Sequence, residues 1–191
     1  HDNGDLDDFF APSAITSSVL ALAIQEIDGE PRVLVGLSKH PWLVRLHEDG
    51  RTDAAFSVRQ QEFGLNGSVT LIAVQPSDGS VVIGGSFSSS AGGWPFRRLG
   101  RLKRDGRPDT DGFRVLSSAL SIDSPPTALC IDGAGNLIVG GTFWRPGSED
   151  YSHLVRLTAT GSHDLTFNPS PDDRVMAISC DANGGLIVGG E

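Results

Sequence analysis

One pattern of turn residues recurs along the sequence and constrains the fold more than any other feature. An Arg-Leu pair is followed by a glycine, then by an aspartate three residues later and by a closing phenylalanine. Complete copies run from Arg45 to Phe56, from Arg101 to Phe113 and from Arg156 to Phe167. Residues 1–10 are the tail of a further copy, which ends at Phe10. A period of roughly 50 residues made of short segments predicts a repeat architecture.

Each repeat also contains apolar segments that are separated by glycine-containing turns. The first segments, called strand a here, are Val19–Gln25, Val69–Gln75, Thr127–Ile131 and Val175–Cys180. The second segments, strand b, are Val33–Gly36, Val81–Gly85, Leu137–Gly141 and Leu186–Gly190. Asp-Gly and Asn-Gly between short apolar runs predict antiparallel hairpins. No segment has a sustained helical period, so we expect little or no helix.

The recurring Arg-Leu closes a third strand, c, and the recurring phenylalanine closes a fourth, d. Strand c is predicted at Trp42–Leu46, Leu99–Leu102 and His153–Leu157. Such a meander is one blade of a β-propeller, and a single blade cannot bury both its faces. The glycine that ends strand b is expected to let a neighbour approach closely.

We therefore predict an all-β propeller of four-stranded antiparallel blades, with three intact blades and one split between the termini. The chain is interpreted as one domain with repeats at about 1–18, 19–67, 68–125, 126–173 and 174–191. Two alternatives stay open. Either these four blade-equivalents close by themselves, or they belong to a larger ring whose unpaired strand edges allow self-association.

The turn between strands c and d predicts an ion pair. A three-residue loop with Gly50 in the left-handed conformation places Arg45 opposite Asp53. The same register pairs Arg101 with Asp109 and Arg156 with Asp164, at about 0.2–1 kcal/mol for each pair. The alternative for each aspartate is an Asx-type bond to nearby backbone N–H groups. Both interpretations are structural, because the same groups recur in every repeat.

The run from Leu71 to Phe87, with its Asp-Gly turn and its Gly-Gly-x-Phe ending, together with Arg101 to Phe113, resembles the delta-60 repeat family. The resemblance covers essentially the whole chain, although Val35-Gly36-Leu37 replaces Gly-Gly in the first repeat. It implies a propeller blade, often within large secreted or cell-surface bacterial proteins. We therefore expect an extracellular or cell-surface location. The resemblance implies no catalytic residues.

Composition excludes several classes of partner. The net charge of −9 argues against nucleic acid, and no apolar run is long enough to span a bilayer. Cys130 and Cys180 are interpreted as small buried hydrophobes, with a disulfide between neighbouring blades as the alternative. The acidic turns at 2–8 and 105–111 do not match a calcium loop, and no zinc or phosphate-binding motif occurs. We expect no metal and no cofactor.

The loops between strands b and c differ between repeats, and all three tryptophans and the only tyrosine lie in or beside them. Binding residues concentrate on loops that a rigid scaffold holds. The candidate ligand-binding residues are Trp42, Trp94, Phe96, Arg97, Trp144, Arg145 and Tyr151. The alternative is that each aromatic side chain covers the end of its own blade.

The favoured function is a non-catalytic scaffold or binding module that presents these loops to a carbohydrate, a peptide or a neighbouring domain. One alternative is a hydrolase or lyase at the same loops. It requires His40 or His153 in a pocket beside a carboxylate with a shifted pKa. No Gly-x-Ser-x-Gly or His-Glu-x-x-His motif supports it, so no catalytic residue is assigned. The other alternative is a purely structural repeat array.

Overall fold

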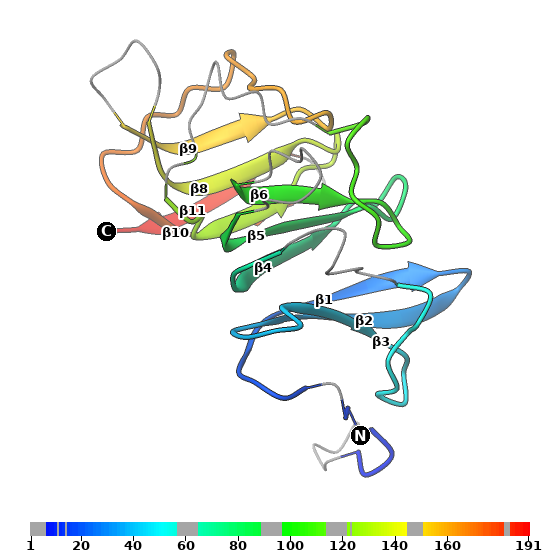
Figure 1. Ribbon diagram of the computed structural model, residues 1–191. Helices are drawn as coiled ribbons and strands as arrows, with labels where there is room; N and C mark the ends of the chain where they lie inside the picture. The colour runs from blue at the N-terminus through cyan, green and yellow to red at the C-terminus, as the bar shows by residue number, and fades with distance from the viewer. Residues whose placement is uncertain are drawn as a thin grey trace.

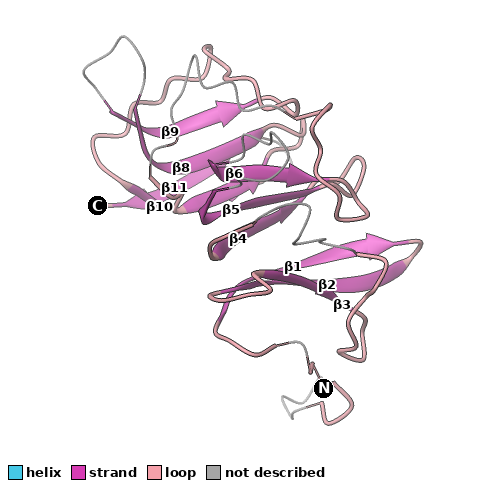
Figure 2. Ribbon diagram, viewed as in Figure 1, coloured by secondary structure: helices cyan, strands magenta, loops and turns pink. Residues whose placement is uncertain are grey.

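The computed structural model describes residues 7–10, 12–13, 15–56, 65–88, 97–113, 122, 124–144, 151–181 and 184–191. These residues form antiparallel strands, as Figure 2 shows, and include no helix that is long and apolar enough to cross a membrane. The first sheet contains β1 (Val19–Ile27), β2 (Glu30–Leu37) and β3 (Leu43–Leu46). The second sheet contains β4 (Val69–Val74), β5 (Val81–Ser88) and β6 (Arg97–Leu102). The third contains β7 (Ala128–Ile131), β8 (Leu137–Trp144) and β9 (Tyr151–Leu157). The last pairs β10 (Val175–Cys180) with β11 (Leu186–Gly190).

The sheets follow one another in chain order and pack face to face (Figure 1). Strand β1 lies against β4, β4 against β7, and β10 against β7 and β8. Each sheet therefore corresponds to one repeat of the sequence. The a strands are neighbours from sheet to sheet, as they are around the axis of a propeller. In Figure 1 the sheet of β1–β3 lies at the bottom of the view, and the pair β10–β11 lies beside β8 near the C-terminus.

The main hydrophobic core fills the spaces between successive sheets. The b strands β5 and β8 are apolar on both faces because they are covered on both, and Val81, Val82 and Ile83 of β5 are all buried. Phe56 and Phe113, which close the turn pattern of the first two intact repeats, belong to this core. The recurring phenylalanine is thus a packing residue between repeats.

The glycine of strand b allows the close approach that the sequence predicts. A Cβ atom at Gly36 would lie 2.5 Å from the carbonyl oxygen of Val69, at the start of the next repeat. A Cβ at Gly140 would lie 2.7 Å from Cγ1 of Val175 in the same way. Because these contacts are too short for any side chain, the spacing between sheets depends on glycine at this position.

The predicted fourth strand is not formed among the described residues. Each c–d turn is followed only by an isolated bridge: Leu46 with Thr52, Leu102 with Pro108, and Leu157 with His163. The recurring aspartate is the reason, since its backbone and side chain begin another turn. The N–H of Phe56 donates to the carbonyl of Asp53 at 3.1 Å, so the chain bends away from the sheet there. The described sheets accordingly have three strands, or two at β10–β11.

The interpretation of the cysteines as free hydrophobes is wrong. Cys130 in β7 and Cys180 in β10 form a disulfide, with their Cα atoms 6.1 Å apart. Neighbouring a strands pack side by side, which brings matching positions of successive repeats within the Cα separation that a disulfide needs. The bond therefore ties the third sheet to the pair β10–β11.

Candidate functional site

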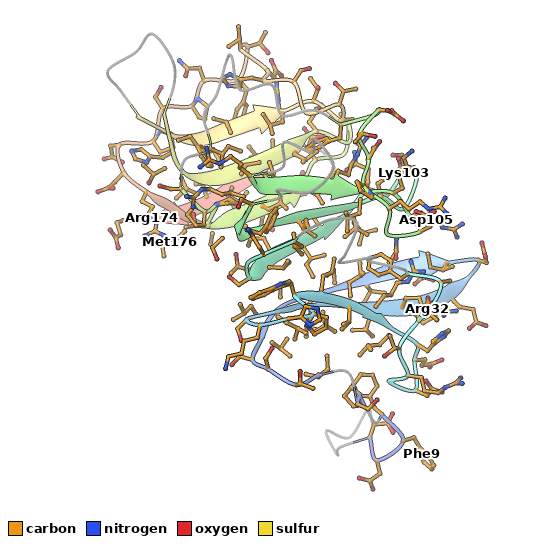
Figure 3. All side chains as sticks on the ribbon, viewed as in Figure 1. Phe9, Arg32, Lys103, Asp105, Arg174 and Met176 are labelled. Atoms are coloured by element: carbon orange, nitrogen blue, oxygen red, sulfur yellow. A yellow bond between two sulfur atoms is a disulfide. The ribbon has the colours of Figure 1, made fainter. Side chains whose placement is uncertain are left out.

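The two ends of the sheets differ in chemistry. The a–b and c–d turns lie together at one end, here called the turn end. There Gln25 Nε2 donates to the carbonyl of Gly79 in an a–b turn, at 2.6 Å. The described residues that flank the b–c loops, and the described starts of strand a, lie at the other end, called the loop end. Figure 3 shows Lys103 and Asp105 of a c–d turn on the opposite side of the molecule from Arg174 and Met176 beside β10.

At the turn end, the predicted ion pair is present in all three intact repeats. The Nε of Arg45 donates to Oδ2 of Asp53 at 2.9 Å, and the backbone N–H of Asp53 donates to the Arg45 carbonyl at 2.8 Å. The corresponding side-chain bonds measure 2.8 Å from Arg101 to Asp109 and 2.8 Å from Arg156 to Asp164. The predicted pairing and cross-strand register are therefore confirmed.

The same aspartates also make the Asx-type bond that was the alternative. Oδ1 of Asp53 accepts the N–H of Ala55, and Oδ1 of Asp164 accepts the N–H of Thr166, both at 2.9 Å. In the second repeat Oδ1 of Asp109 accepts the N–H of Gly112 instead, one position further along. The extra residue of that repeat is therefore accommodated inside the Asx turn. One carboxylate serves both the ion pair and the turn.

Arg45 and Arg101 also connect their own sheets with the next repeat. Nη1 of Arg45 donates to the carbonyl of Arg104 at 2.8 Å, and Nη1 of Arg101 donates to the carbonyl of Ala159. Those carbonyls occupy the same position in the next c–d turn. The guanidinium carbons also lie 4.5–5.0 Å from the ring centres of the repeat phenylalanines, within cation–π range. We call this set of contacts the arginine latch.

Sequence reasoning missed a second connection between repeats. Gln25 and Gln75 are buried at the ends of their a strands. Gln75 Nε2 donates to the carbonyl of Gly135 at 2.7 Å, as Gln25 does to Gly79, and Oε1 of Gln25 accepts Nη1 of Arg45 at 2.7 Å. The available signal was a glutamine just after an apolar strand in two repeats.

The electrostatics of the turn end lower the pKa values of two of its aspartates, Asp53 and Asp164. Burial raises the pKa of Asp53, but the charge of Arg45 and the N–H of Ala55 outweigh it and hold that pKa below its usual value. Bonds from the hydroxyl and N–H of Thr166, and then from Arg156, lower the pKa of Asp164 to about 2. Carboxyl groups whose pKa lies far below 7 are poorly suited to proton transfer at neutral pH. Their chemistry is that of structural pairs.

The structure places the predicted binding residues at the loop end only in part. Trp42 has a φ of 62°, and its partly buried side chain packs against the main core. Arg97 is exposed at the start of β6, and the backbones of Trp144 and Tyr151 are paired across β8 and β9. Trp94, Phe96 and Arg145 lie outside the described residues.

A pocket of about 530 Å³ lies at the loop end, between the starts of β4, β7 and β10. Its lining comprises Thr70, Leu71, Ser124, Pro125, Pro126, Thr127, Thr142, Arg174 and Met176. Sequence reasoning concentrated on the b–c loops and missed this site. The available signal was that the connections into strand a must end at the same place as those loops.

The pocket combines one cation with hydroxyl groups and apolar surface. Arg174 is exposed and presents the single charged side chain of the lining, while Leu71 and Met176 give it apolar walls. The hydroxyl of Thr127 donates to the Val175 carbonyl and helps to join the neighbouring strands. Among the residues that the structure describes, neither a histidine nor a carboxylate lines the pocket. The described lining can bind a polar anion and includes no acid–base pair.

The histidines of the enzyme alternative are not gathered around this pocket. His40 is exposed in the first b–c loop, and His153 lies in β9 with a buried Nδ1 that has no hydrogen-bond partner in the described part of the chain. The described ranges also hold no group of three or more His, Cys, Asp or Glu residues able to bind a metal ion.

A family model described as "Domain of unknown function (DUF5122) beta-propeller" matches residues 77–111 and 135–167. These two segments are propeller-type repeats. Each match runs from an a–b turn to the following c–d turn, so one includes Arg101 and Asp109 and the other Arg156 and Asp164. A comparison with curated proteins found no match. Both matches thus include a c–d turn, and the family description assigns no activity.

Proposed function

We propose that this protein is a non-catalytic binding module of a secreted or cell-surface protein, built from delta-60-type repeats, and that its loop end binds a carbohydrate or a peptide. The observation that carries the proposal is the pocket around Arg174. It joins a cation, hydroxyls and apolar walls, and its described lining residues include no histidine or carboxylate to perform acid–base chemistry.

The pocket favours a ligand that bears a carboxylate. A guanidinium binds carboxylates through two parallel hydrogen bonds, which gives both charge and orientation. The hydroxyls of Thr70 and Thr142 add polar contacts, and the Leu71 and Met176 side chains suit the apolar face of a sugar or an aliphatic side chain. An acidic sugar or an acidic peptide fits this combination.

The disulfide supports the proposed location. Disulfides persist in oxidising compartments and are rare in the cytosol of most organisms. The bond between Cys130 and Cys180 joins two repeats that already pack together, so it acts as a structural bond. Secretion or display at the cell surface is consistent with it.

A purely structural array is the second candidate, because the arginine latch recurs between repeats and needs no ligand. The proposals are separated by a printed array of neutral and acidic glycans and peptides, probed with the wild type and two arginine variants. Arg174→Ala removes the pocket cation. Arg107→Ala is the matched control, since Arg107 lies in a c–d turn with a side chain that is 72% exposed.

The binding proposal predicts that the wild type and Arg107→Ala bind the same acidic probes and that Arg174→Ala does not. Trp94→Ala and Trp144→Ala are expected to weaken the same signals if the b–c loops contribute. Equal binding by the wild type and Arg174→Ala would show that the pocket is not the site. Absence of binding to every probe would favour the structural array.

A further inference from the structure

The starts of strands β4 and β10 share one irregularity of the backbone, and the side chains at that position line the loop-end pocket. In β4 the pairing with β5 shifts by one residue at Thr70, and in β10 the pairing with β11 shifts in the same way at Met176. Both side chains line the pocket. A bulge of this kind re-aims a side chain that a regular ladder would fix.

Thr127 holds the same position in the third repeat. The residue that follows Thr127 pairs with Gly140, and the residue that follows Thr70 pairs with Gly84, the corresponding glycine of strand b. Thr127 also lines the pocket. Three repeats thus contribute the same backbone position, here called the bulge position, to one pocket, and two of them place a threonine there.

The hydroxyl hydrogens of both threonines are used inside the protein. Oγ1 of Thr70 donates to the Gly84 carbonyl at 3.4 Å, and Oγ1 of Thr127 donates to the Val175 carbonyl. A hydroxyl has one hydrogen and two acceptor lone pairs, so each oxygen keeps accepting capacity. The bulge position therefore offers hydrogen-bond acceptors to the pocket, and it suits a ligand that carries O–H or N–H donors.

Arg174 adds donors to these acceptors. It lines the same pocket, and Figure 3 shows it with Met176 beside β10. A guanidinium has five N–H donors and no acceptor, and its planar shape matches a carboxylate. A ligand that satisfies both parts of the pocket carries one carboxylate together with separate donor groups.

These two requirements favour an acidic sugar over an acidic peptide. Each peptide unit brings a carbonyl acceptor with its N–H donor, and a carbonyl that faces the threonine lone pairs is left unpaired. A sugar hydroxyl rotates, so it can donate to a threonine oxygen without that cost. Leu71 and Pro126 lie together over Gly84 and give an apolar surface for the sugar ring.

We propose that the loop-end pocket binds a uronate ring, whose carboxylate pairs with Arg174 and whose hydroxyls donate to Thr70 and Thr127. The inference rests on the proposed function, because it takes this pocket as the binding site. It adds the ligand class and two specificity-determining residues. Arg174 selects for the carboxylate, and the two threonines select for the hydroxyls.

Four small probes separate these contributions. Glucuronate carries a ring, hydroxyls and a carboxylate; cyclohexanecarboxylate carries the ring and the carboxylate alone; and glucose lacks the carboxylate. A blocked dipeptide of aspartate and glycine is the acidic peptide probe. Dissociation constants are measured by NMR titration of the wild type, Thr70→Val, Thr127→Val and Arg174→Ala. Thr52→Val is the matched control, because Thr52 is an exposed threonine at the turn end.

The wild type and Thr52→Val are expected to bind glucuronate about tenfold more tightly than any other probe. Thr70→Val and Thr127→Val should each weaken glucuronate binding about two- to tenfold, as expected for one neutral hydrogen bond. They should leave the affinity for cyclohexanecarboxylate unchanged, and Thr127→Ser should restore glucuronate binding. Arg174→Ala should weaken the binding of both acids by about tenfold or more.

Several results would overturn the inference and leave the proposed function standing. They are threonine variants that bind glucuronate like the wild type while Arg174→Ala does not, threonine variants that weaken both acids equally, and a dipeptide that binds at least as tightly as glucuronate. Equal affinity of the wild type for glucuronate and cyclohexanecarboxylate would overturn it as well. Equal glucuronate binding by the wild type and Arg174→Ala would contradict the proposed function itself.

Discussion

The turn end and the loop end of the same sheets differ in how they use their polar groups. At the turn end, an arginine, an aspartate and a phenylalanine make the same contacts in three successive repeats. At the loop end, the connections differ in sequence between repeats. Arg174 lines the pocket there, and no arginine recurs at this position in the other repeats. Repetition therefore marks the contacts that hold the stack together, and the proposed binding surface lies where the repeats differ.

The two ends also differ in how far their charged side chains are buried. The side chains of Arg101 and Asp109 are both 8% exposed, so their charges are compensated inside the protein. Arg174 is exposed, and its charge is directed to solvent or ligand. A buried charge pair costs stability when one partner is removed, while an exposed arginine costs little. Stability measurements on arginine variants can therefore test this difference.

The largest effect is expected for Arg101→Ala. The substitution leaves Asp109 buried without its cation and removes the bond to the Ala159 carbonyl of the next repeat. The free energy of unfolding should fall by about 3–5 kcal/mol. Urea denaturation measures it, with Arg107→Ala expected to change stability by less than about 0.5 kcal/mol. Equal losses in both variants would refute the structural role of the latch.

Removal of the disulfide ranks next. Cys130→Ser/Cys180→Ser frees two repeats separated by 50 residues. The expected loss is about 2–4 kcal/mol, largely because the unfolded chain gains freedom. Denaturation of the wild type with and without reductant gives the same comparison without substitution. A stable, unchanged protein under reducing conditions would show that sheet packing alone holds β10–β11 in place.

A smaller loss is expected for Arg156→Ala. The side chain of Arg156 is 28% exposed, against 3% for Arg45, although its pairing with Asp164 is the same. An exposed pair contributes about 1 kcal/mol or less, so the loss should be clearly below that of Arg101→Ala. Denaturation of the two variants in the same buffer tests the order. A reversed order would mean that burial does not set the strength of the latch.

The smallest effect concerns pH. The folded-state pKa of Asp164 is about 2, below the unfolded value of about 3.9. Its carboxylate therefore stabilises the fold above about pH 4, and this contribution is lost as the pH falls through about 2. Asp164→Asn should be less stable than the wild type at pH 7, with the difference vanishing near pH 2. A difference that is constant across this range would contradict the assigned pKa.

The sequence predicts the turn end well because its geometry is local. Arg45 and Asp53 are eight residues apart, and the position of Gly50 alone fixes their register. The same reasoning fails for strand d, because the extra hydrogen bonds of the aspartate end the ladder after one bridge. The ion pair and the Asx turn were predicted as alternatives, but one carboxylate makes both.

Features between repeats were harder to predict. Gln25 reaches a carbonyl 54 residues away, and the disulfide joins residues 50 apart. Both depend on how closely the sheets stack, which the order of residues within one repeat does not determine. The pocket is a further case, because Thr70, Thr127 and Arg174 begin three different repeats and meet only when the sheets are packed.

The most direct test of the division between the two ends is a titration of the isotopically labelled protein with glucuronate, followed by amide chemical shifts. Glucuronate carries the carboxylate and the sugar ring that the pocket favours. Binding in the loop-end pocket should shift the amide signals of Thr70, Thr127, Thr142 and Arg174. The amide signals of Asp53, Asp109 and Asp164 should stay unchanged. Shifts confined to the c–d turns would contradict it.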